Sequence, residues 1–529
     1  MQASRTAPEF DTLDLILDVA VVGSGLSGVA IAHELCQRGL KVALFEARPR
    51  LGGRIESVAC AEGTALDLGP TWYWPAAQPR MHALVERLGL RSLPQHDPGD
   101  LLVLEHAGDA PKLLQSEGLH AGARRLAAGM QSLLDALAQD LPRERVHLEH
   151  ALCTVTKREA LLELGFDGCG ERRVVRARRA VLAMPPRLIA EQVRFEPELD
   201  EDLEASLHAT PTWMGTAAKV VLRYPAAFWR AAGRSGNAFV QHLQAVLGEV
   251  FDSCDEAAGL FALGAFLALS PQERERYSAG LPLLMRHQIP QLFETGQAEP
   301  ALHYRDWARE PWTCSRRDLR EHVPHAAHPE CGAPELARPY WSERLFFAGS
   351  ETAEREGGYL EGALVAAERV LLQLSAAESS AAEAMEDLRS WLQAQHVPTL
   401  ARYQQAIFAG LAGQVDEPLT QRALLSALAP VFEGALRALQ AQRAPAPVAL
   451  QALAREAFRD FLPELLRAVL TWNRRSCALS NFDEEHRPSH SYLQAILHEL
   501  DAAFARFSRE VEVLAQRAAS AAHPENRSA

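Results

Sequence analysis

The sequence predicts an α/β protein with an all-α C-terminal module, and three observations support that prediction. A short apolar run at 18–22 is followed at once by a glycine-rich turn and a helical pattern. A second apolar run follows at 41–45, as in a β-α-β unit with parallel strands. From 376 onward, apolar residues such as Leu424 and Leu428 recur at helical spacing.

The size and charge of the chain narrow the class of protein. With 529 residues, two to four domains of roughly 100–200 residues are expected. The net charge of −14 argues against nucleic-acid binding, which needs a basic surface. The acidity would attract a cationic substrate, or it serves only to keep the protein dissolved.

The sequence shows no pattern typical of a membrane span or of a secretory signal. No stretch reaches the roughly 18 apolar residues of a membrane span. Residues 1–14 lack the basic region and apolar stretch of a secretory signal. The eight cysteines include no CxxC pair, which favours free thiols in a reducing compartment. We therefore expect a cytoplasmic protein that does not cross a membrane.

The turn after the first predicted strand has the spacing of a dinucleotide-binding site. Gly23 permits the tight turn, Gly25 lets the backbone approach a pyrophosphate, and Gly28 lets the helix, expected at 29–38, pack closely on the sheet. The N–H groups at the helix start would face the phosphates. Glu46 ends the second strand, where its carboxylate can accept hydrogen bonds from ribose hydroxyls.

A second stretch, Arg48 to Arg54, distinguishes FAD from NAD. The Gly52-Gly53-Arg54 sequence directly after the ribose acid resembles the second conserved stretch of FAD-dependent amine oxidases. The resemblance implies that Arg54 contacts the diphosphate or supports the flavin, through charge-assisted hydrogen bonds.

A C-terminal stretch strengthens the resemblance to this family. It runs from Gly349 and Glu351 to Gly358-Tyr359-Leu360 and Ala363. In monoamine and polyamine oxidases the equivalent of Glu351 meets the phosphate–ribitol part of FAD. A helix start near 362–363 would face the pyrimidine end of the flavin and stabilise its reduced anion. Tyr359 would form one wall of an aromatic cage for the amine.

Two further stretches resemble segments of the family, and the first of them differs from the family's sequence at one position. Asp67-Leu-Gly69-Pro70-Thr71-Trp72 is similar to the family's segment along the flavin, with Pro70 in place of a glycine. Trp72, Tyr73 and Trp74 then belong either to the substrate pocket or to a core cluster. Lys219 falls where the family places a lysine that reaches flavin N5 through a water. Alternatively, it snorkels from a strand to solvent.

The match departs from the family at 312–318. Monoamine oxidases have a Cys and a Tyr at about 316 and 317, but this chain has two arginines, and Cys314 is two positions out of register. We therefore expect FAD to be bound non-covalently. The second wall of the aromatic cage is missing, and Trp312 or an aromatic residue of 72–74 would replace it.

The resemblance spans roughly residues 15–375 and implies a discontinuous, Rossmann-like FAD-binding domain with an α+β substrate domain. The FAD-binding domain is assigned to 15–75, 150–190 and 335–375, the substrate domain to 76–149 and 191–334, and the helical domain to 376–529. The candidate cofactor-binding residues are Gly23, Gly25, Gly28, Glu46, Arg48, Gly53, Arg54, Gly69, Pro70, Thr71, Leu152, Gly349, Glu351, Gly358, Tyr359, Leu360 and Ala363. The candidate catalytic residues are Lys219, Tyr359, Trp312 and Trp72.

The resemblance implies oxidation of an amine. A neutral amine would bind beside the flavin, hydride equivalents would pass from its α-carbon to N5, and the imine would leave and hydrolyse. Dioxygen would then take the electrons and give hydrogen peroxide.

Other readings stay open. The missing cage wall leaves room for an FAD-dependent desaturase, dehydrogenase or isomerase acting on a non-amine substrate. The helical module raises the possibility of an interaction protein with a vestigial flavin site, against which the intact Glu46, Arg54 and Glu351 argue. The helices would serve packing, homodimerisation or docking of a partner. His486, His490, His498 and Glu499 lack the spacing of a metal-binding helix, so no metal site is expected.

Overall fold

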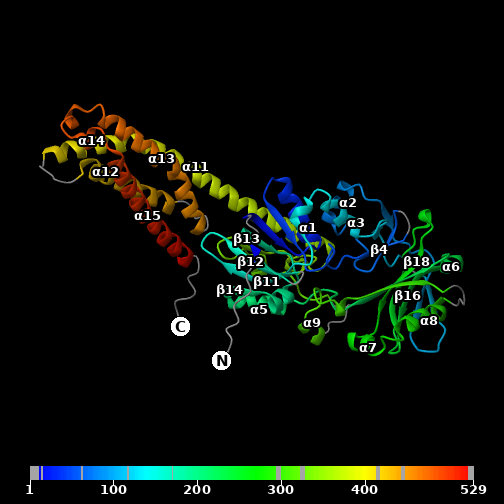
Figure 1. The fold of residues 1–529 in the computed structure, drawn as a ribbon. Helices are drawn as coiled ribbons and strands as arrows, with labels where there is room; N and C mark the ends of the chain where they lie inside the picture. The colour runs from blue at the N-terminus through cyan, green and yellow to red at the C-terminus, as the bar shows by residue number, and fades with distance from the viewer. Residues whose placement is uncertain are drawn as a thin grey trace, which may run out of the picture. The chain divides into compact units, whose positions relative to one another are not determined.

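The computed structural model describes residues 11–12, 16–60, 63–115, 118–168, 171–293, 299–321, 328–412, 418–441 and 447–521. The chain separates into two compact units, unit 1 at Met1–Leu371 and unit 2 at Leu372–Ala529 (Figure 1). None of the helices within the described ranges is long and apolar enough to cross a bilayer.

A nine-stranded sheet forms the first half of unit 1. Its order is β10 (Val146–His147), β3 (Val42–Phe45), β2 (Leu17–Val22), β13 (Glu171–Leu182), β12 (Leu162–Gly168), β11 (Ala151–Lys157) and β14 (Arg194–Glu196). Two more strands, β1 (Asp11–Thr12) and β20 (Leu345–Phe347), pair with β13. The last residues of β13 pair in parallel with both β2 and β20, whereas its first half pairs antiparallel with β12. The predicted strands at 18–22 and 41–45 are confirmed to within one residue.

Helix α1 (Leu26–Gln37) follows β2 after a turn of three residues. The prediction of a helix at 29–38 was wrong by three residues at its start. The reason is that Gly25 already forms the N-cap, with φ −65° and ψ 178°, so that Gly28 lies inside the first turn of the helix. The helix ends one residue early, before Gly39 at φ +81°, a conformation that favours glycine.

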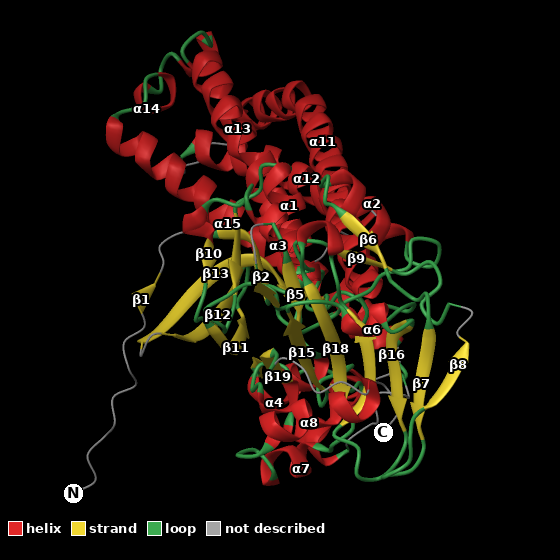
Figure 2. Cartoon of the chain, turned by 90° about the vertical axis from the view of Figure 1, so that its right-hand side faces the viewer, coloured by secondary structure: helices red, strands yellow, loops and turns green. Residues whose placement is uncertain are grey.

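A seven-stranded sheet forms the second half of unit 1 (Figure 2). Its order is β19 (Ala301–Asp306), β15 (Ala218–Tyr224), β18 (Phe261–Leu267), β17 (Leu247–Asp252), β16 (Arg234–Val240), β7 (Asp100–Leu104) and β8 (Lys112–Gln115). Alternate residues such as Val220 and Ala265 form a core with Met285 and Ile289 of α8 (Leu281–Phe293). The opposite face therefore carries the intervening side chains, including Lys219.

The other elements of unit 1 are short. They are the helices α2 (Pro79–Arg87), α3 (Gln131–Ala138), α4 (Pro186–Gln192), α5 (Glu201–Ala209), α6 (Phe228–Ala231), α7 (Pro271–Arg276), α9 (Arg316–Arg320) and α10 (Pro334–Ala337), and the two-stranded pairs β4 (Ser57–Ala59) with β5 (Ala65–Asp67) and β6 (Ser92–Pro94) with β9 (Arg124–Leu126). The division of this unit into an FAD-binding and a substrate domain stays a prediction. The two sheets follow it closely, although β1, β10 and β14 of the first sheet fall a few residues outside the expected ranges.

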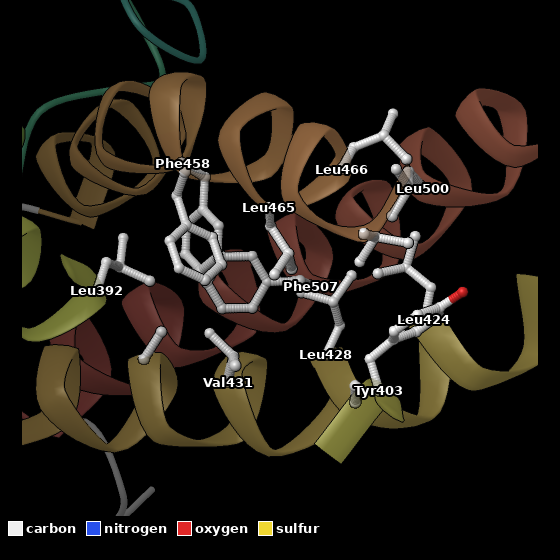
Figure 3. Packing of buried hydrophobic residues seen from close by; sticks show 14 of the residues in the cluster. Leu392, Tyr403, Leu424, Leu428, Val431, Phe458, Leu465, Leu466, Leu500 and Phe507 are labelled. Carbon is white, nitrogen blue, oxygen red and sulfur yellow. The ribbon is translucent and has the colours of Figure 1, made fainter. Parts of the chain in front are cut away.

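Unit 2 is helical, as expected for 376–529. It contains the end of α11 (Leu360–Ala412), α12 (Leu419–Ala441), α13 (Pro447–Asn473), α14 (Asp483–His486) and α15 (His490–Ala521). The Ala/Ser-rich stretch at 375–383 is part of α11 and does not interrupt it. Residues 442–446 lie outside the described residues, and α13 begins at Pro447. Leu428, Val431, Phe458 and Phe507 pack together in the core of this unit (Figure 3).

A buried polar network crosses the core of unit 2. The Glu485 carboxylate accepts hydrogen bonds from the backbone N–H groups of Leu419 (2.7 Å) and Thr420 (3.0 Å), at the start of α12, and from the Tyr492 hydroxyl (2.7 Å). Asn473 donates to the Thr420 hydroxyl and accepts from the Tyr403 hydroxyl. Because buried donors without partners are costly, Glu485 holds the ends of three helices together.

We predict that Glu485→Ala lowers the free energy of unfolding of unit 2 by about 2 kcal/mol or more, since it leaves several buried donors unsatisfied. Urea unfolding of the full chain, followed by far-ultraviolet circular dichroism, measures the loss. The control is Glu464→Ala on an exposed position of α13, with an expected change below about 0.5 kcal/mol. Equal effects of the two substitutions would show that the Glu485 network does not stabilise the unit.

Candidate functional site

A cavity of about 400 Å³ lies within unit 1 and is lined from both sheets. The predicted cofactor residues that line it are Gly23, Gly25, Glu46, Arg48, Gly53, Arg54, Gly69, Pro70, Thr71, Leu152, Gly349, Gly358, Tyr359, Leu360 and Ala363. All four candidate catalytic residues, Lys219, Tyr359, Trp312 and Trp72, line it too. The structure therefore gathers into one cavity residues that are separated by more than 300 positions. Gly28 and Glu351 lie behind its wall.

The turn between β2 and α1 leaves open space in front of its backbone. A methyl group built on Gly25 meets no atom within 4 Å, and Gly25 lines the cavity. A methyl group on Gly28 would lie 1.9 Å from the carbonyl oxygen of Gly23, so that only glycine allows this close packing of helix and turn. The first turn of α1 has no acidic residue and no side-chain cap. Its N-terminus therefore presents a positive end to the cavity.

Glu46 is buried at the end of β3 and fixed by four hydrogen bonds. Its Oε2 accepts from the Ser24 backbone N–H (2.9 Å) and hydroxyl (2.6 Å). Its Oε1 accepts from the Arg48 backbone N–H (3.0 Å) and Nη1 (3.3 Å). These bonds hold the carboxylate at the cavity wall beside the turn, in the position expected for a ribose contact.

Arg54 and Glu351 form a bidentate ion pair. Arg54 Nη1 donates to Glu351 Oε1 (2.6 Å) and Nη2 donates to Oε2 (3.0 Å). Arg54 also donates to the Trp213 carbonyl and the Ser350 hydroxyl, each at 2.8 Å. Glu351 is fully buried and faces Arg54, whereas the expectation placed it against the phosphate–ribitol part of the cofactor. Its role in this structure is to fix the guanidinium that lines the cavity.

Two buried polar atoms near the turn indicate that the residues fit a dinucleotide. The Ser27 hydroxyl and Arg48 Nε have no hydrogen-bond partner among the described residues, although the Glu310 carboxylate lies 3.7 Å from Arg48 Nε. Ser27 and Arg48 both line the cavity next to the N-terminus of α1. A diphosphate would supply acceptors to donors that otherwise stay unsatisfied, and two arginines would neutralise its charge.

Lys219 of β15 lies completely inside unit 1. It is 1% exposed, and its Nζ donates to the Gly69 carbonyl (2.8 Å) and the Thr71 hydroxyl. The rings of Phe251 and Phe266 lie 5.3 and 5.5 Å from Nζ. Burial lowers the pKa of Lys219 to about 8, against the opposing charge of Asp67. The alternative that this lysine snorkels to solvent was wrong, since the sheet and its neighbours cover it.

Aromatic side chains line the part of the cavity near Lys219. Trp72, Trp74 and Trp312 are among them, whereas Tyr73 is fully buried outside the cavity and belongs to the core. The Tyr359 ring stacks on His328 at 4.9 Å between centroids, with 7° between the planes. Burial raises the pKa of Tyr359, so its hydroxyl stays protonated near neutral pH.

Sequence reasoning missed several residues of this wall. They are Trp213, Phe266 and Trp307. The Trp213 ring lies 5.7 Å from that of Tyr359, and Trp307 Nε1 donates to the Leu68 carbonyl (3.0 Å). Trp213 directly precedes the stretch that contains Lys219, which was the one signal that could have identified it. Phe266 pairs with Lys219 across the sheet, a relation that no local motif records.

The cysteine expected out of register does not face the cavity. The Cys314 thiol is buried against the Ser315 carbonyl (3.7 Å), and burial raises its pKa to about 12. None of the described cysteines lines the cavity. Position 316 begins α9, and Glu191 accepts hydrogen bonds from the backbone N–H groups of both arginines there.

The described part of the chain holds no group of three metal-ligating side chains. His486 Nδ1 lies 3.0 Å from the Asn473 carbonyl, in a hydrogen bond that joins α14 to α13.

Comparisons with known proteins agree with this site. The model of the family "Flavin containing amine oxidoreductase" matches residues 99–370, and that of "NAD(P)-binding Rossmann-like domain" matches 21–88. A flavin-containing amine oxidase from Danio rerio is 27% identical over 257 residues, which are 46% of each chain. The chain thus spans about half the length of that relative. A putrescine oxidase from Kocuria rosea is 24% identical over 406 residues, covering 56% of this chain and 83% of the relative.

Solved structures show the same fold over 69% of the chain. A putrescine oxidase bound to putrescine aligns with a TM-score of 0.57 at 20% identity, covering 69% of this chain and all of that one. A cyclohexylamine oxidase from Brevibacterium oxydans aligns with a TM-score of 0.54 at 22% identity. Because the first family model covers more than half of the 529 residues, the chain belongs to the family of flavin-containing amine oxidoreductases, with FAD as its cofactor.

Proposed function

We propose that this protein oxidises an amine with non-covalently bound FAD. The observation that supports the proposal is that one cavity joins the glycine turn of β2–α1 to an aromatic compartment beside the buried Lys219. When bound, FAD accepts a hydride equivalent from the α-carbon of the amine and passes the electrons to dioxygen, giving hydrogen peroxide.

The residues of the charged part of the cavity would hold the cofactor. The N-terminus of α1 at Gly25 would receive the diphosphate, and Glu46 would accept hydrogen bonds from the ribose. Arg54, held by Glu351, would contact the diphosphate or the flavin. Non-covalent binding is supported by the cavity lining, which contains no cysteine among the described residues.

The aromatic compartment would bind the amine in its neutral form. Its walls include Trp72, Trp312 and Tyr359, and removal of the amine from water lowers its pKa. Amine oxidation needs a free electron pair on nitrogen, so a desolvating pocket favours the reactive form. Tyr359 would align the amine, and its stack on His328 restricts the movement of its ring.

Lys219 would act in the part of the cavity where the amine is oxidised. Its hydrogen bonds to Gly69 and Thr71 fix the ammonium beside the segment that is similar to the family's flavin-facing strip. From this position it would hold a water near flavin N5. Below pH 8 its positive charge would also stabilise the negative charge that dioxygen gains during electron transfer.

The first experiment is anaerobic addition of monoamines, diamines, amino acids and polyamines to the purified holoprotein, with flavin absorbance as the measurement. We expect one class of amine to bleach the flavin and air to restore it with release of hydrogen peroxide. A yellow protein that no amine bleaches would contradict amine oxidation and favour C–C desaturation or isomerisation. A protein that takes up no FAD would contradict the assignment of the cofactor site.

Substitution of Gly25 and Gly28 separates cofactor binding from folding. Gly25→Ala should raise the dissociation constant for FAD by roughly tenfold or more, since its methyl group enters the space for the diphosphate. The stability of its apoprotein should change by less than about 1 kcal/mol. Gly28→Ala should destabilise the apoprotein by about 1–3 kcal/mol, because it forces helix and turn apart. Titration with FAD and urea unfolding measure the two effects, and unaltered FAD affinity in Gly25→Ala would exclude this diphosphate site.

Lys219→Met should slow reoxidation of the reduced flavin by oxygen by roughly tenfold or more. In the wild type the rate constant should fall as the pH rises through about 8, since the lysine then loses its proton and its charge. The variant should show no such step. Stopped-flow absorbance measures reduction and reoxidation separately, and Lys112→Met on an exposed strand is the control. Unchanged rates of both half-reactions in Lys219→Met would remove this residue from the mechanism.

A further inference from the structure

The ring of Trp72, which lines the cavity, is held at its edge by one hydrogen bond. Its Nε1 donates to Gln95 Oε1 at 2.9 Å, and the two residues are 23 positions apart in the chain. An indole N–H can only donate, and the ring carries no other polar atom. The bond to Gln95 therefore fixes the direction in which the edge of the ring points.

The Gln95 side chain is itself fixed by further hydrogen bonds. Its Oε1 also accepts from Arg125 Nε (2.9 Å), and its Nε2 donates to the carbonyl oxygens of Asp252 (2.9 Å) and His96 (3.3 Å). With the amide turned over, its N–H groups would face two donors and its oxygen would face two carbonyls. Gln95 therefore presents an acceptor, and not a donor, to Trp72.

The face of the Trp72 ring is covered by His120. The two rings stack at 4.7 Å between centroids, with 28° between their planes. His120 is buried, and its Nδ1 donates to Asp97 Oδ1 (3.0 Å), because a carboxylate can only accept. The His120 backbone N–H donates to Asp97 Oδ2 (2.8 Å), and the Asn237 amide donates to Oδ1 (3.1 Å). The imidazole is thus fixed in its turn, and it limits the tilt of the indole.

A third ring completes the support of Trp72. Phe251 of β17 meets it edge to face, with 4.5 Å between centroids and 63° between planes. Gln95 and His120 lie behind the Trp72 ring, outside the set of described residues that line the cavity. They therefore act on the contents of the cavity only through Trp72.

The position of this ring matters for the proposed reaction. Trp72 directly follows Thr71, whose hydroxyl accepts a hydrogen bond from Lys219. Hydride transfer needs the α-carbon of the amine close to the acceptor atom and in line with it, and small displacements cost large factors in rate. A wall that could turn would let the amine take many orientations, whereas a fixed wall restricts them.

We propose that Gln95 and His120 are positioning residues that hold Trp72 as a rigid wall of the substrate compartment. Gln95 sets the direction of the indole edge, and His120 sets the plane of the ring. Loss of either lets the ring turn, so that the amine is aligned less often for reduction of the flavin. The proposal rests on the proposed amine oxidation and adds two residues that act on its reductive half-reaction alone.

The kinetic test is a double-mutant cycle in the holoenzyme, with the limiting rate constant of flavin reduction by amine as the measurement. Gln95→Leu should lower it about tenfold. Reoxidation by oxygen and the dissociation constant for FAD should stay within about twofold. Trp72→Phe removes the N–H that Gln95 accepts, so Gln95→Leu added to this variant should change the rate by less than about twofold. Gln241→Leu at an exposed position after β16 is the control and should keep the wild-type rate.

A second readout does not depend on turnover. The holoprotein is labelled with fluorotryptophan, and the fluorine NMR signal of Trp72 is the one that is missing from Trp72→Phe. The wild type should give a single narrow signal for this ring. Gln95→Leu should broaden or split the signal, because the ring then samples more than one orientation. His120→Leu should shift it, because the stacked ring is lost.

Three results would overturn the proposal. The first is an unchanged rate of flavin reduction in Gln95→Leu. The second is a loss in Gln95→Leu that persists undiminished in the Trp72→Phe background, since Gln95 would then act through another group. The third is an unaltered Trp72 signal in both Gln95→Leu and His120→Leu. If no amine reduces the flavin, amine oxidation itself fails, and the fluorine signal then decides whether Gln95 and His120 hold the ring.

Discussion

The buried Glu351 carboxylate joins three distant parts of unit 1. It accepts two hydrogen bonds from Arg54, which follows the glycine turn, and one from the backbone N–H of Trp213, ahead of β15 (3.1 Å). Its own segment follows β20 at the other end of the unit's sequence. A fully buried carboxylate is tolerated only with partners of this kind, since an unpaired one costs several kcal/mol. The wall of the cavity that both sheets share therefore depends on this one side chain.

The two parts of the cavity have opposite chemistry for a physical reason. Around the β2–α1 turn the protein offers N–H groups, arginines and hydroxyls, which suit a charged diphosphate. Around Lys219 it offers rings, and burial lowers the pKa of the lysine to about 8. A single compartment could not both stabilise a dianion and favour a neutral amine. Because the cavity is divided in this way, one part can hold a charged cofactor while the other holds a substrate that has been removed from water.

The fold of the N-terminal part could be read from local patterns. Apolar runs predicted β2 and β3, and the turn glycines predicted the close packing of α1, because each depends on neighbours only a few residues away. The start of α1 was misplaced by three residues, since the N-cap is a matter of backbone geometry at Gly25 and no side chain marks it. In unit 2 the helical spacing of leucines predicted helices, but not the network around Glu485.

The candidate site shows which features of the protein the sequence alone does not determine. By itself the sequence determined that a dinucleotide turn, an acid at position 46 and a lysine at position 219 are present, because residue type and short spacing are enough for each. Only the tertiary structure decided that Trp72 and Trp74 line the cavity while Tyr73 is core, that Glu351 pairs with Arg54, and that Phe266 pairs with Lys219 across the sheet. These relations depend on strand register and on contacts between segments up to about 300 positions apart, which no local spacing specifies.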